Sequence, residues 1–95
     1  MNAFIVAHST IHDPEKFQTY AKAVPATLVP YRGEITLRGK LDHVLTGEHQ
    51  YKSVAVLQFP DHAALDAWYN SAEYQALIEL RDAGADMVIS TFSKM

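Results

Sequence analysis

Four segments of the chain carry hydrophobic patterns that are typical of short β-strands. They are rich in β-branched and aromatic residues, and apolar side chains recur within each run. Turn-forming residues bound these runs, with Gly33 before the second and Pro60 after the third. The pattern predicts strands over residues 3–10, 34–40, 53–59 and 86–92.

Helical spacing of apolar residues fills the interval between the first two strands. Asp13, Pro14 and Glu15 supply an N-cap, a first-turn proline and a first-turn acid, so a helix is expected to begin there. Pro25 has no backbone N–H and its ring clashes with the preceding turn, which predicts a kink or a restart at that position. We therefore expect two helical pieces that end near Tyr31.

A second helical region follows the third strand. Asp61 is placed to cap its first helix, and Ser71 is placed to cap a further helix that ends at Gly84. Leu65 and Trp68 lie on one side of the first of these helices. The second is expected to be continuous and to carry four residues on one side: Tyr74, Leu77, Ile78 and Arg81.

The resulting order, β-α-β-β-α-β, predicts an α+β, ferredoxin-like fold with a four-stranded antiparallel sheet and the helices on one face. Residues 41–52 show no clear periodicity, and with Gly47 they are expected to form a hairpin or a turn between strands. The chain has 95 residues, 48% of them hydrophobic, so residues 1–95 are expected to form a single domain.

Both faces of the predicted sheet are apolar. In the third strand Val54 and Val56 point to one side, and Ala55 and Leu57 point to the other. A sheet with one face in water would instead alternate apolar with polar residues. Because the helices cover only one face, we expect a second copy of the chain to cover the other, in a two-fold homodimer. A small chain without cysteine also gains stability from association.

Charge and composition limit the classes of partner. The net charge is −3, and the eight Lys and Arg residues are scattered singly, so no nucleic-acid partner is expected. No apolar run is long enough for export or for a membrane span, so we expect no membrane partner and a cytoplasmic location. Phosphate-binding loops, nucleophile elbows and Cys-His pairs are also absent, and no cofactor is expected.

Arg81 is the first candidate for chemistry, because it shares a helical stripe with apolar residues and needs polar partners there. One interpretation is structural: its stem packs while its head pairs with a carboxylate such as Asp66 or Asp86. The other is that it reaches a pocket and binds a carboxylate or phenolate of a ligand.

Arg38 is the second candidate. Strict alternation along its strand places it on the face opposite Ile35 and Leu37, directed either into the helix layer or toward the dimer interior. A partly buried guanidinium in either setting pairs structurally or binds an anionic small molecule, and the sequence leaves both interpretations open.

Five aromatic residues supply flat apolar walls with polar tips. They pack in the core or line a ligand cleft between sheet and helices, and both interpretations are open. Ser71 is explained by capping, with anion binding at the same helix start as the alternative. The aromatic candidates are Tyr20, Tyr31, Trp68, Tyr69 and Tyr74.

The five histidines do not have metal-ligand spacing. His8 and His12 are four residues apart, but the first lies in a predicted strand and the second in the turn after it, so no metal site is expected. His8 or His43 alone could act as a general base in a cleft, although neither has a visible carboxylate to orient it. They are the weak catalytic candidates.

Motifs spread over the whole chain match the pattern of one known family. They are Asp13-Pro14-Glu15, Tyr20, Val24-Pro25, Tyr31, Gly33, Leu37-Arg38-Gly39, Leu45, Gly47, Phe59-Pro60, Trp68 to Ser71, Glu73-Tyr74 and Leu80-Arg81. With these residues the chain resembles the domain-of-unknown-function 1330 family, a branch of the dimeric α/β-barrel superfamily. The resemblance implies a ferredoxin-like protomer whose sheet pairs with a second sheet to close a barrel, and it carries over Arg38, Trp68, Tyr69, Ser71, Tyr74 and Arg81. This sequence differs from the family pattern at Arg32, Lys40, His43 and Thr46.

These observations lead to three functional hypotheses. The first is a homodimer that binds a small aromatic or anionic molecule in a cleft between sheet and helices. The second, by analogy within the superfamily, is a cofactor-free enzyme of the monooxygenase or isomerase kind. The third is a non-catalytic interaction or scaffold module whose cleft is filled by side chains.

Overall fold

A computed structural model describes all residues, 1–95, and has nine helical and strand elements. Their order confirms the β-α-β-β-α-β pattern, with each helical region divided into shorter pieces. The elements are β1 (Ala3–Ile11), α1 (Pro14–Leu28), the 3₁₀ helix η1 (Val29–Tyr31), β2 (Glu34–Lys40), β3 (Ser53–Phe59), α2 (His62–Tyr69), α3 (Ala72–Gln75), α4 (Ile78–Gly84) and β4 (Ala85–Ser93).

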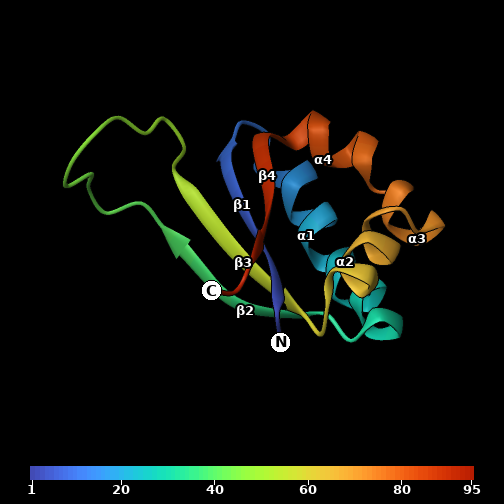
Figure 1. Cartoon of the computed structure of the whole chain (residues 1–95). Coiled ribbons are helices and arrows are strands. Elements are labelled where there is room, and N and C mark those ends of the chain that lie inside the picture. Colours follow the sequence, from blue (N-terminus) through green and yellow to red (C-terminus); the bar gives the residue numbers. More distant parts are fainter.

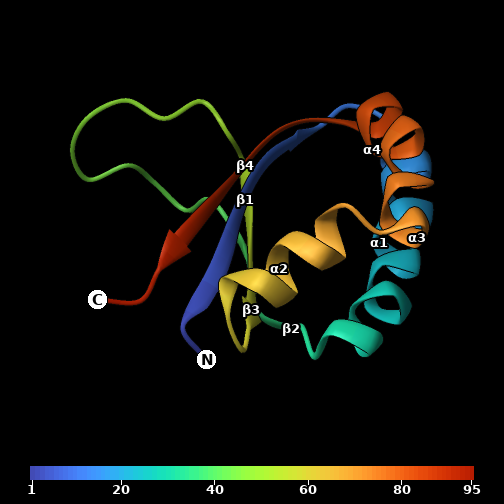
Figure 2. The same cartoon turned by 45° about the vertical axis from the view of Figure 1, so that its right-hand side comes forward.

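The strands form one antiparallel sheet in the order β2-β3-β1-β4. All helices lie on one side of this sheet, which is seen nearly edge-on in Figure 2 and more obliquely in Figure 1. This is the ferredoxin-like fold predicted from the sequence. Residues 41–52 arch away from the sheet on the side without helices, and they form a long irregular connection rather than a tight hairpin.

The predicted N-caps are confirmed. The carboxylate of Asp13 accepts from the backbone N–H of Lys16, and that of Asp61 accepts from the N–H of Ala64 at 2.8 Å. The Ser71 hydroxyl accepts from the backbone N–H of Tyr74 and so caps the start of α3. Each side chain satisfies a backbone donor that has no partner inside the helix.

The first helical region has two pieces and ends at Tyr31, as predicted, but the division falls after Leu28 and the helix does not restart at Pro25. Helix α1 runs through this proline and ends at Leu28, where the backbone tightens into η1. Pro25 is exposed, while Val24 and Leu28 are buried, so packing of the inner face holds the helix across the missing hydrogen bond. Arg32 then takes a left-handed conformation, with φ of 57°, and turns the chain toward β2.

The continuous helix predicted after Ser71 is also divided. At the end of α3 the backbone N–H of Leu77 donates to the carbonyl of Tyr74, only three residues back, at 2.9 Å. This tighter turn separates α3 from α4. The arrangement leaves Tyr74 fully buried and Arg81 on α4, close enough to donate to its hydroxyl.

A bulge in β2 changes which way its side chains point. Ile35 pairs with Leu57 and Arg38 pairs with Ala55, but the register shifts between Ile35 and Leu37. The extra residue puts Ile35 and Arg38 on the same face and Leu37 on the other. Strict alternation had placed Arg38 opposite both residues, which is correct for Leu37 and wrong for Ile35.

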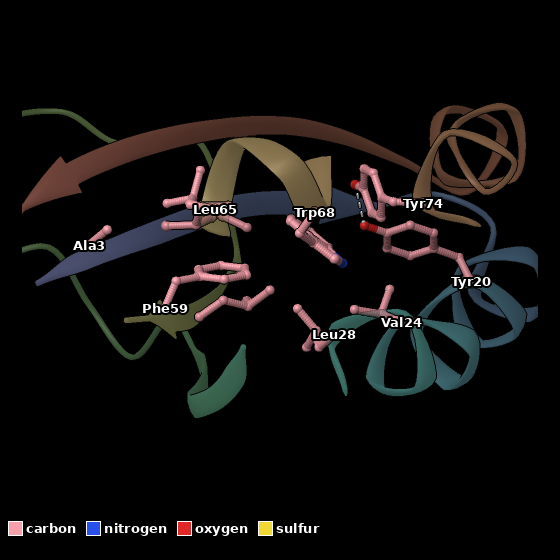
Figure 3. Close-up of a cluster of buried hydrophobic side chains, with 11 residues drawn as sticks. Ala3, Tyr20, Val24, Leu28, Phe59, Leu65, Trp68 and Tyr74 are labelled. Atoms are coloured by element: carbon pink, nitrogen blue, oxygen red, sulfur yellow. Dashed lines mark hydrogen bonds between the residues drawn. The ribbon is translucent and has the colours of Figure 1, made fainter. Parts of the chain in front are cut away.

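The core lies between the sheet and the helices. Ile5 and Phe59 from the sheet are almost completely buried, and Trp68 from α2 is 2% exposed. Figure 3 shows Phe59 and Trp68 close together in this core, with the hydroxyls of Tyr20 and Tyr74 in contact. The buried cluster comprises Ala3, Ile5, Ala7, Tyr20, Val24, Leu28, Leu57, Phe59, Leu65, Trp68 and Tyr74.

Gly84 is needed where α4 meets the start of α1. A Cβ at this position would lie 2.7 Å from the backbone nitrogen of Phe17 and 2.9 Å from its Cα. Because backbone cannot move aside cheaply, Gly84→Ala is expected to lower the free energy of unfolding by about 1 to 3 kcal/mol, measured by urea denaturation. Gly39→Ala is the control, because its Cβ would make an ordinary contact of 3.4 Å. Equal losses for the two variants would contradict this account.

Candidate functional site

An apolar cavity lies between the helix-facing side of the sheet and α1, and its volume is about 410 Å³. Twenty residues line it, and fifteen of them are hydrophobic. Every strand of the sheet contributes, and Tyr20, Trp68 and Tyr74 add aromatic walls. This is the cleft between sheet and helices expected from the sequence, and its size and apolar lining are typical of small-molecule sites.

Two cationic side chains on β2, an edge strand of the sheet, line this cavity. Arg38 and Lys40 both come from β2, and both line the cavity. Neither takes part in an ion pair or in a side-chain hydrogen bond of the structure. Since no Asp or Glu lines the cavity, the lining carries positive charge without an acidic partner.

A hydrogen-bonded group of tyrosines and one arginine lies at the helix side of the cavity. The hydroxyls of Tyr20 and Tyr74 are 2.8 Å apart. The Arg81 guanidinium donates from Nη1 to the hydroxyl of Tyr74 at 3.0 Å and to that of Tyr69 at 3.3 Å. Its Nε donates to Asp82 at 3.0 Å. Arg81 therefore pairs with Asp82 and two phenols, and not with Asp66 or Asp86 as the sequence suggested.

The charge states in this group follow from burial and hydrogen bonding. Burial, reinforced by the neighbouring Tyr74, raises the pKa of Tyr20 above its ordinary value, so this hydroxyl stays protonated. Burial alone would lower the pKa of Arg81, but hydrogen bonds to Tyr69 and Tyr74 raise it above its ordinary value. Arg81 thus stays a cation, while its side chain is only 12% exposed.

Trp68 is held in place by packing and by one hydrogen bond. Its ring lies 4.3 Å from that of Tyr74 and 5.4 Å from that of Phe59, between ring centroids. Its indole N–H donates to the Thr27 hydroxyl at 2.9 Å, and Thr27 donates in turn to the carbonyl of Val24 at 2.6 Å. The indole is therefore both a core residue and a wall of the cavity.

The predicted binding residues divide into two groups. The cavity is lined by Arg38, Tyr20, Trp68 and Tyr74. Four others do not line it: Tyr31, Tyr69, Ser71 and Arg81. Ser71 caps α3, and its hydroxyl donates to the carbonyl of Trp68 at 2.7 Å. Arg81 donates to the hydroxyls of both Tyr69 and Tyr74.

The two histidine candidates lie elsewhere. His8 is on the sheet face that the helices do not cover, with its ring 4.9 Å from that of His49. His43 is on the exposed connection between β2 and β3, 3.0 Å from the carboxylate of Asp42. Neither histidine lines the apolar cavity.

Sequence reasoning missed three polar residues that line the cavity: Lys40, Ser9 and Ser53. Lys40 is two residues beyond Arg38 and so shares its face of β2, a strand-period signal present in the sequence. The two serines gave no such signal, because a buried serine in a strand is indistinguishable by pattern from a packing residue. No group of three or more His, Cys, Asp or Glu residues is arranged to hold a metal ion. None of the helices has both the length and the apolar character needed to cross a membrane.

Comparison with known families gives one match, which spans nearly the whole chain. The model of the family described as "Domain of unknown function (DUF1330)" matches residues 2–95. No curated protein matches the sequence.

Solved structures share the fold at low sequence identity. A protein of unknown function from Rhodopseudomonas palustris has a TM-score of 0.85 at 13% identity, over 99% of this chain and 82% of that chain. A dimeric ferredoxin-like protein of unknown function from Jannaschia sp. CCS1 has a TM-score of 0.75 at 13% identity, over 97% and 98% of the two chains. SnoaB, a cofactor-independent oxygenase from Streptomyces nogalater, has a TM-score of 0.67 at 14% identity, over 99% and 93%. Similarity at these identities establishes the fold and no activity.

Proposed function

This chain belongs to the domain-of-unknown-function 1330 family, and we propose that it binds a small aromatic anion in the cavity between the sheet and α1. The family match confirms the resemblance seen in the sequence. Because the family has no assigned activity, the function is inferred from the cavity itself.

The observation that carries the proposal is an apolar cavity with cations and no acids in its lining. The aromatic walls of Trp68, Tyr20 and Tyr74 favour a flat apolar body. Arg38 and Lys40, which have no acidic partner in the protein, favour an anionic group at the edge strand. A bound anion would balance charges that the protein itself leaves unpaired.

A titration with naphthoate tests the proposal, because Trp68 is the only tryptophan of the chain and lines the cavity. Saturable quenching or enhancement of its fluorescence is expected. Arg38→Gln should weaken naphthoate binding about tenfold, the effect of one charge-assisted hydrogen bond. A fluorescence change that does not saturate would contradict the proposal.

Two controls separate site binding from general charge effects. Lys22→Gln removes the same unit of charge from an exposed position of α1 that does not line the cavity, and it should leave naphthoate affinity unchanged. Naphthalene methanol has no charge, so its weaker binding should be insensitive to Arg38→Gln. Equal losses in the Lys22 and Arg38 variants would show that only net charge matters.

We further propose that the protein works as a homodimer through the open face of the sheet. Half-buried and exposed apolar side chains cover this face, including a stacked pair, Phe4 and Phe92, with ring centroids 5.3 Å apart. Leu37 is 66% exposed there, and exposure of this extent on a face with several apolar side chains favours burial by a partner. Two of the structures that share this fold are described as dimeric ferredoxin-like proteins, which supports the same arrangement.

The alternative function is a cofactor-free enzyme. It is supported by the shared fold of SnoaB, a cofactor-independent oxygenase. The positions of His8 and His43 outside the cavity weigh against a histidine base acting on a molecule bound there. Binding without assigned turnover is therefore the function that the geometry supports best.

A further inference from the structure

The tyrosine pair in the cavity has one more hydroxyl hydrogen than the protein has acceptors for. Tyr20 and Tyr74 each bring one O–H, and the bond between them, at 2.8 Å, uses one of the two. The structure has no further hydrogen bond from either hydroxyl to a side-chain or backbone acceptor. Whichever tyrosine donates to the other, the second O–H has no acceptor within the protein.

Arg81 cannot take this hydrogen. A guanidinium has only donors, so its contact with Tyr74 occupies a lone pair of the phenol oxygen and supplies no acceptor. Ionisation does not remove the hydrogen either, because burial raises the pKa of Tyr20 above its ordinary value. Tyr20 therefore keeps its hydroxyl hydrogen.

Both tyrosines of the pair are buried beside the cavity. Tyr20 and Tyr74 are both 7% exposed or less, and both line the cavity. Figure 3 shows the two hydroxyls meeting between α1 and the segment that carries Tyr74. The acceptor therefore comes from water or from a molecule bound in the cavity, because a buried O–H without one costs about 1 to 3 kcal/mol.

We propose that the spare hydroxyl of the Tyr20–Tyr74 pair donates to a carbonyl oxygen of the bound molecule. The inference rests on the proposed function and narrows its ligand class to aromatic ketone or quinone carboxylates. The carboxylate belongs at Arg38 and Lys40, on the edge strand. The acceptor at the tyrosines is neutral, because the cation beside them, Arg81, is already paired with Asp82, and a second anionic group in this apolar cavity would carry a large desolvation cost.

The test compares two tricyclic acids that differ in one group, fluorenone carboxylate and fluorene carboxylate. The wild-type protein should bind the ketone about threefold to tenfold more tightly, as one added hydrogen bond of about 1 kcal/mol implies. The double variant Tyr20→Phe with Tyr74→Phe should lose this preference and still bind fluorene carboxylate. Each single variant keeps one O–H, so at least one of them should retain the preference.

Tyr31→Phe is the matched control, because this tyrosine does not line the cavity and should leave the preference intact. Infrared spectroscopy of the wild-type complex gives a readout that does not depend on how the variants fold. The carbonyl stretch of bound fluorenone carboxylate should lie below its frequency in an apolar solvent. Equal affinity for the two acids, or an unshifted carbonyl stretch, would overturn the donor assignment while leaving the cavity as a binding site. Failure of both acids to bind would overturn the proposed function as well.

Discussion

Replacing Trp68 by alanine is expected to lower the free energy of unfolding by about 3 to 5 kcal/mol, a large part of the stability of a small domain. The indole is 2% exposed and packs against Phe59 and Tyr74. Its removal opens a void in the core, adjoining the cavity, and leaves the Thr27 hydroxyl without its donor. Urea denaturation followed by far-ultraviolet circular dichroism measures the loss.

Trp68→Phe is the graded control for this prediction. It keeps an aromatic ring in the core but removes the indole N–H that donates to Thr27, so its loss should be clearly smaller than that of Trp68→Ala. A loss below about 1 kcal/mol for the alanine variant would show that the ring is not buried as the structure places it.

Val56→Asp is expected to convert the proposed dimer to a folded monomer. Val56 lies on the open face, where it pairs across the strands with Val6 and Leu37. In a two-fold interface the substitution occurs twice and places carboxylates in an apolar contact, so the dissociation constant should rise by at least about a hundredfold. Sedimentation velocity over a range of protein concentrations measures the change.

The same substitution at the neighbouring Leu57 is expected to have a different effect, and the contrast identifies which face of the sheet forms the interface. Leu57 is 6% exposed and points into the helix layer, so Leu57→Asp should unfold the protomer rather than dissociate a folded one. Val56→Thr is nearly isosteric and uncharged, and it should remain dimeric. A Val56→Asp protein that sediments like the wild type would refute the proposed interface.

Local pattern was a good guide where backbone chemistry decides the structure. The caps at Asp13, Asp61 and Ser71 were predicted because a side-chain oxygen at a helix start serves donors only a few residues away. The third strand was predicted to its ends, residues 53–59, because Pro60 stops it and β-branched residues fill it.

The same reasoning failed where packing outweighed local preference. Pro25 was expected to kink its helix or to make it restart; α1 does not restart there, because the buried residues on either side hold it together. The bulge between Ile35 and Leu37 has no clear signature in the sequence, yet it decides that Arg38 shares a face with Ile35 and lines the cavity. For the candidate site, the sequence supplied the residue types but not their grouping.

The sequence by itself determined the order of strands and helices, the helix starts at Asp13, Asp61 and Ser71, and apolar residues on both faces of the sheet, since each depends on the spacing of neighbouring residues. Only the tertiary structure decided which candidates meet. Tyr20 and Tyr74 are 54 positions apart, and their hydrogen bond depends on where α1 and α3 pack. Arg81 donates to the Tyr74 hydroxyl, and Arg38 lines the cavity, for the same reason. Contacts between residues far apart in the sequence depend on helix packing and strand register, which no local pattern encodes.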